Sequence, residues 1–67
     1  MYFWQGFYTP NIDVEVNPPI RKGVRDSVWV KTKIKNKKEA INAIKRKLDI
    51  CYGVKAEDIE IQYEFST

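Results

Sequence analysis

The chain has 67 residues, of which 43% are hydrophobic and 31% charged, with a net charge of +3, one cysteine and no histidine. This length allows one domain, residues 1–67, with a small core. A single thiol without histidine excludes an intramolecular disulfide and the usual zinc sites. No stretch approaches the roughly 18 apolar residues of a transmembrane helix, and the N-terminus lacks a basic signal segment. We therefore expect a soluble cytoplasmic protein with no membrane partner.

The first predicted element is a strand over residues 2–8, since aromatic side chains favour strands and Thr9-Pro10-Asn11 is a turn signal. It holds five of the chain's nine aromatic residues: Tyr2, Phe3, Trp4, Phe7 and Tyr8. Alternation places Tyr2, Trp4 and Tyr8 on one face of the strand, with Phe3 and Phe7 on the other. Both faces therefore require cover.

Two segments follow before the middle of the chain. Residues 12–16 alternate apolar Ile12, Val14 and Val16 with two acids, which predicts a half-buried second strand. Residues 20–27 are basic and contain Gly23, which permits the positive φ of a turn, so a mobile loop or a loose hairpin end is expected.

Residues 28–35 give the clearest strand pattern. Apolar and small residues alternate with a second set, which consists of Trp29, Lys31, Lys33 and Lys35. This second set predicts a face with one aromatic ring and three cations.

A helix is expected from about residue 37 to residue 51 or 52. Asn36 is a suitable N-cap, with Glu39 three residues on as in a capping box, and Gly53 suits the left-handed end. Its apolar stripe is predicted to contain Ile41, Ile44, Leu48 and Cys51.

The last predicted strand covers residues 59–65. Its inner face is expected to hold Ile59, Ile61, Tyr63 and Phe65, and its outer face Glu60, Gln62 and Glu64. The fold class is thus α+β, with a three- or four-stranded sheet and one helix packed on one face, in the order β-β-β-α-β.

Catalysis is not expected. There is no histidine for acid–base chemistry, the one cysteine is predicted to be buried, and no phosphate-binding glycine loop is present. We predict neither an enzyme nor a cofactor or metal site.

The aromatic strand predicts a non-catalytic protein-binding module: a small adaptor, inhibitor or assembly subunit of the size and composition found in phages and mobile elements. The predicted anchors are Tyr2, Trp4, Tyr8 and Trp29, because Tyr and Trp bury large areas at interfaces. A homodimer through the same strand would also cover its second face.

Nucleic-acid binding is the alternative, because eleven of the twelve cations lie between residues 21 and 47. It would use the Trp29, Lys31, Lys33 and Lys35 face together with the loop cations Arg21, Lys22 and Arg25. However, if the last strand neighbours residues 28–35, Glu60 and Glu64 would pair with those lysines and leave an ordinary mixed surface.

Overall fold

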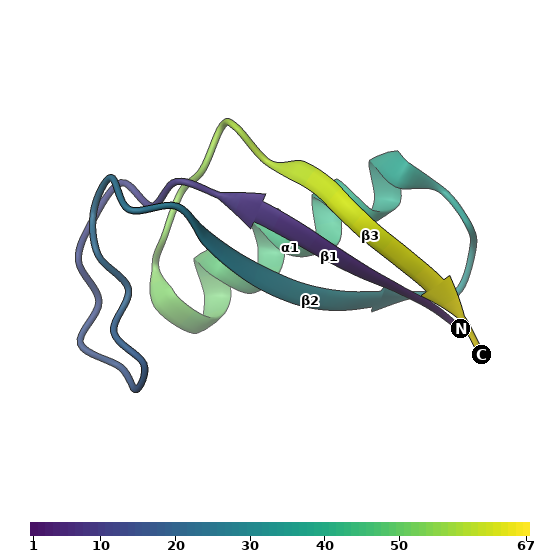
Figure 1. Ribbon diagram of the computed structural model, residues 1–67, viewed down its shortest axis with the longest axis horizontal. Coiled ribbons are helices and arrows are strands. Elements are labelled where there is room, and N and C mark those ends of the chain that lie inside the picture. The colour runs from purple at the N-terminus through teal and green to yellow at the C-terminus, as the bar shows by residue number, and fades with distance from the viewer.

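The computed structural model describes residues 1–67 and contains three strands and one helix. Their order is β1 (Tyr2–Tyr8), β2 (Asp26–Thr32), α1 (Lys37–Tyr52) and β3 (Glu60–Ser66). The strands form one antiparallel sheet in the order β2-β1-β3, with α1 on one face (Figure 1). The predicted α+β class with one helix is confirmed, but the element order is β-β-α-β, one strand fewer than expected.

The N-terminal strand β1 is the centre of the sheet. It pairs over its whole length with β2 on one side and from Tyr2 to Phe7 with β3 on the other. Directly paired residues share a face, so the register assigns Trp4, Val30 and Val28 to the side of α1. Phe3, Lys31 and Trp29 belong to the opposite side.

The core lies between this sheet and α1. Ile44 and Leu48 of the helix are fully buried, and Tyr8 of β1 is only 2% exposed. Gly6 lets the helix approach, because a Cβ there would lie 2.5 Å from Ile44 Cδ1. Burial, followed by the charges of Asp26 and Tyr52, raises the pKa of Tyr8 to about 12.

The helix has the predicted ends. Asn36 Oδ1 accepts a hydrogen bond from the Glu39 backbone N–H at 3.2 Å, and Gly53 closes the helix with a φ of 68°. Cys51, however, is exposed. The buried positions Ala40, Ile44 and Leu48 recur every four residues, so the stripe continues to half-buried Tyr52 and not to Cys51.

The predicted strand over residues 12–16 is absent. Only Val14 forms an isolated bridge, with Ile20, inside one loop, and no other strand lies beside the segment. Ile20 is 5% exposed and belongs to the core, although the sequence placed it in a mobile loop. The predicted strand 28–35 instead spans residues 26–32. It stops at Thr32 because Thr32 pairs with Tyr2, the first residue of the antiparallel strand β1.

A bulge in β3 changes which face its side chains occupy. Gly6 pairs with Ile61 and its neighbour Gln5 pairs with Tyr63, so Gln62 is an extra residue. Ile61 therefore packs against the core, whereas Tyr63 lies on the other face of the sheet. A single inner face for residues 59–65 was the wrong prediction beyond Gln62.

Candidate functional site

Four aromatic side chains form one cluster on the sheet face opposite α1, which we call the open face. They are Phe3 of β1, Trp29 of β2, and Tyr63 and Phe65 of β3. The Phe3 and Phe65 ring centroids are 5.0 Å apart and nearly parallel. Trp29 meets Phe65 at 5.8 Å and Tyr63 at 6.0 Å, in edge-on contacts. Since β1 separates β2 from β3, the indole of Trp29 spans the central strand to reach these rings.

The cluster is exposed to solvent. Trp29 is 41% exposed, Tyr63 56% and Phe65 40%. With each aromatic side chain worth 150–250 Å² of area, these three expose on the order of 300 Å². The largest apolar patch on a typical monomer is about 300–600 Å² and is often functional. The open face is therefore a docking candidate.

The ring orientations limit what can stack on this face. Neighbouring strands lie about 4.8 Å apart, close to the Phe3–Phe65 centroid distance of 5.0 Å. These two rings therefore stand side by side on the sheet, with their faces toward each other and their edges toward solvent. Trp29 is turned by 68° relative to Phe65, so its flat surface faces a different direction from those two rings.

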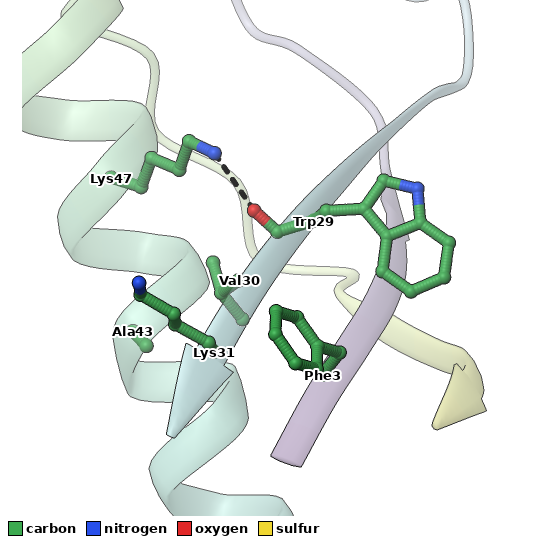
Figure 2. A pocket seen from close by; sticks show the side chains of 6 residues that line it. All are labelled: Phe3, Trp29, Val30, Lys31, Ala43 and Lys47. Atoms are coloured by element: carbon green, nitrogen blue, oxygen red, sulfur yellow. Dashed lines mark hydrogen bonds between the residues drawn. The ribbon is translucent and has the colours of Figure 1, made fainter. Parts of the chain in front are cut away.

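A groove of about 420 Å³ runs between β2 and α1 beside the open face. It is lined by Phe3, Trp29, Val30, Lys31, Ala43 and Lys47. Figure 2 shows the Phe3 and Trp29 rings on the side of β2 away from the helix, the Lys31 amino group toward the helix, and Lys47 extending from the helix toward β2. Lys47 Nζ donates a hydrogen bond of 2.7 Å to the Trp29 carbonyl oxygen.

The three lysines predicted on the Trp29 face differ in their surroundings. Because β1 lies between β2 and β3, the last strand does not neighbour β2, and Lys31 and Lys33 take part in no ion pair. Lys35 lies beyond the end of β2 and pairs with Glu64 at 3.7 Å. The proposed neutralisation by β3 thus reaches Lys35 alone.

Trp4 and Tyr8 are buried and not available as anchors, and Tyr2 lies on the same face as they do. Trp4 is 4% exposed and its Nε1–H donates to Thr32 Oγ1 at 2.9 Å, while Tyr8 is 2% exposed. Tyr2 is half-buried on the same face. These positions correct the prediction, since the even-numbered residues of β1 are the ones that α1 covers. Of the four predicted anchors only Trp29 is on the open face.

Phe3, Tyr63 and Phe65 were missing from the predicted site. The alternation of β1 already separated Phe3 from Trp4, but it does not show which of the two sets lies under the helix. Tyr63 and Phe65 could not be found that way, because the bulge at Gln62 leaves no clear mark in the sequence.

The loop cations predicted to meet a partner are mostly held by the protein itself. Arg21 forms an ion pair with Glu15, whose hydrogen bond and charge raise the pKa of Arg21. Lys22 is held by its backbone alone: its N–H donates to Asp13 at 2.7 Å, and its ammonium group takes part in no ion pair. The predicted mobile loop is therefore tied to its own acidic half.

Arg25 joins this loop to the start of β3. Its guanidinium pairs with Asp58 at 2.6 Å and with Glu60 at 2.5 Å. Asp58 also accepts two hydrogen bonds from Thr9, and these contacts, with those of Arg25, lower the pKa of Asp58. The cation is thus part of the framework around β1 and not a free contact.

No group of three or more metal-ligating side chains comes together in the structure. The helix α1 is neither long nor apolar enough to cross a membrane. No protein-family model, curated protein or solved structure matches the chain, so its site is interpreted from its own geometry.

Proposed function

We propose that this protein is a non-catalytic protein-binding module, a small adaptor, inhibitor or assembly subunit, which docks through the open face of its sheet. The observation that carries the proposal is the exposed cluster of Phe3, Trp29, Tyr63 and Phe65 on a face that α1 does not cover. Aromatic anchors at the centre of a patch are typical of binding hot spots.

The ring geometry favours a protein as the partner. The Phe3 and Phe65 rings, whose edges face solvent, can insert between apolar side chains of a partner protein, because packing at interface cores resembles that of protein interiors. The polar rim is also present: Gln5 and Ser27 lie on the same face, beside the rings. A folded partner or a peptide can satisfy both parts.

The test uses the double variant Trp29→Ala/Tyr63→Ala, with Ile50→Ala as the matched control. Ile50 is 75% exposed on α1, away from the open face. The Ile50→Ala substitution therefore removes an exposed apolar side chain without changing the open face. A protein recovered with the wild type from cell extract is purified and recombined with each variant. We expect binding to survive in Ile50→Ala and to fall at least about a hundredfold in the double variant, as loss of two hot-spot residues implies. Equal affinity of all three chains would refute the proposal.

Single-stranded nucleic acid is the second candidate, favoured by the unpaired Lys31 and Lys33 beside the Trp29 ring. It predicts retention of an oligonucleotide at about 50 mM salt that declines steeply as salt rises, because phosphate contacts release counterions. Absence of retention at low salt removes this candidate.

Self-association stays a prediction. A three-stranded face of seven-residue strands covers roughly 14 by 23 Å from strand geometry, which is less than the ~800 Å² per partner of a standard interface. A dimer through this face alone would be weak, and light scattering across a concentration series measures it. The cytoplasm is proposed as the compartment because Cys51 is an exposed, unpaired thiol, and thiols persist under reducing conditions.

A further inference from the structure

We infer that the partner presents an acidic and apolar segment, which lies along the groove between β2 and α1 with its apolar side chains against the Phe3 and Trp29 rings. The inference rests on the proposed function, since it names the chemistry of the partner at the same surface.

The groove has one apolar and one cationic wall. Phe3, Trp29 and Val30 supply the apolar surface, and Lys31 and Lys47 supply ammonium groups beside it (Figure 2). A segment that fills this groove therefore places a carboxylate within reach of two cations while its neighbouring side chain meets the rings. Opposite charges matched across an interface speed association and select the partner.

Lys47 is already held in position. Its Nζ donates one hydrogen bond to the Trp29 carbonyl oxygen at 2.7 Å, and an ammonium group has two further donors. Fixing this side chain beforehand lowers the entropy that binding a carboxylate would cost. The same bond occupies a backbone acceptor on the β2 edge, and a strand added to β2 at this point would have to displace it.

The positive charge continues past this groove. An adjoining groove shares Lys31 and Ala43 and adds Lys33 and Arg46, with Glu39 as its one acid. None of the four cations Lys31, Lys33, Arg46 and Lys47 takes part in an ion pair. By contrast, the cation at the opposite end of the sheet, Arg25, is bound by two carboxylates. Unpaired cations therefore gather at the C-terminal end of β2 and on the neighbouring part of α1.

A second copy that docked through its own β3 would offer only carboxylates that are already paired. Glu60 and Glu64 are the carboxylates of β3, and both are already paired, with Arg25 and Lys35 respectively. Nucleic acid would supply charge, but Phe3 and Phe65 each have one face covered by the other ring, which leaves fewer ring faces for base stacking. An acidic polypeptide meets both conditions.

The experiment measures binding of labelled probes by fluorescence anisotropy. One peptide of about ten residues alternates Glu with Leu and Phe; a second replaces each Glu by Lys, and a third replaces each apolar residue by Ser. An oligothymidylate of about ten nucleotides is the fourth probe. Each is titrated at about 50 and 200 mM salt, because screening weakens exposed charge contacts.

The variant Lys31→Glu reverses a groove charge, and Lys45→Glu is its matched control. Lys45 lies on the other side of α1, beside Asp49 and Val54. Both variants replace a lysine by a glutamate, so they change the net charge equally. Of the four probes, we expect only the acidic-apolar peptide to bind the wild-type protein. Its affinity should be about tenfold lower for Lys31→Glu and within about twofold of the wild-type value for Lys45→Glu.

Four results would overturn the inference: no binding of the acidic-apolar peptide at about 1 mM, equal binding of the Lys or Ser peptides, equal losses in both variants, or tighter binding of the oligothymidylate. The proposed function fails separately. If Trp29→Ala/Tyr63→Ala loses its protein partner while Lys31→Glu keeps it, docking through the rings stands and the acidic partner does not.

Discussion

The two faces of this sheet carry similar aromatic residues with opposite roles. On the α1 side, Trp4 and Tyr8 are 4% and 2% exposed and form the core. On the open face, Trp29 and Phe65 are 41% and 40% exposed. The chemistry of the side chains is the same, and the difference arises because a chain with one helix can bury one face only. Aromatic content alone thus does not tell a buried side chain from an exposed one; the position relative to the helix does.

The largest expected effect is on stability, from Trp4→Ala compared with Trp29→Ala. Removing a buried Trp costs about 3–5 kcal/mol, and Trp4 also loses its hydrogen bond to Thr32. Trp29→Ala loses two ring contacts of about 0.5–1.5 kcal/mol each beyond their area burial, and it loses less buried area than Trp4→Ala because Trp29 is 41% exposed. Urea unfolding measures both free energies, with Trp4→Phe as the substitute where Trp4→Ala does not fold. Equal losses of unfolding free energy in the two tryptophan variants would contradict the difference in burial between the two faces.

The next effect concerns the contact that brings α1 close to the covered face. Gly6→Ala puts a methyl group 2.5 Å from Ile44 Cδ1, and overpacking of this kind costs about 1–3 kcal/mol. Ile44→Val removes that Cδ1 atom. The free energy of unfolding that the double variant loses should therefore be smaller than the sum of the two single losses, by about 0.5 kcal/mol or more. Urea unfolding measures all three losses. Simple additivity would mean that the helix does not rest on Gly6.

Alkaline pH should weaken the covered face through Tyr8. Its pKa is raised to about 12 from an ordinary value of 10.0, mainly by burial. The folded state therefore keeps the phenol proton more tightly than the unfolded state. Its contribution to stability is complete below pH 10 and is lost as the pH rises toward 12. In urea unfolding above pH 10, Tyr8→Phe should lose less stability than the wild type; parallel losses would contradict this assignment.

The smallest effect is optical. Trp29 is exposed and Trp4 is not, so acrylamide should quench part of the emission of the wild type strongly. Trp29→Phe keeps a ring on the open face, should change stability by no more than about 0.5 kcal/mol, and leaves Trp4 as the one emitter. Its emission should be blue-shifted and weakly quenched. Strong quenching of this variant would place Trp4 in contact with solvent.

Much of the helix could be predicted because its signals are local. Asn36 and Gly53 mark its ends through contacts within one turn, and both were recognised in the sequence. The strand order could not be predicted, since the central place of β1 depends on residues 26–32 and 60–66, far along the chain. The alternation in residues 12–16 misled for a related reason: a strand pattern forms no strand where no neighbouring strand lies beside it.

The site was predicted in part. Trp29, Lys31 and Lys33 lie beside the groove or the open face, as the alternation of their segment indicated. The choice of Trp4 over Phe3 was wrong because the sequence does not say which side of β1 the helix covers. Tyr63 and Phe65 depend on one extra residue in β3, and a bulge of this kind moves every later side chain to the other face.

The central position of β1 also affects how the protein is made. Of the three strands of the sheet, β1 is synthesised first. It completes its pairing only when residues 60–66 are present, since β3 pairs with its second edge. Until then residues 2–8, which carry no charge and no proline, have the composition of an aggregation-prone segment. Non-local pairing of this kind also slows folding, because distant segments must meet first. We expect β2 and α1, which are neighbours in the chain, to pack early, and the nascent protein to be most vulnerable while its aromatic first strand waits for its last partner.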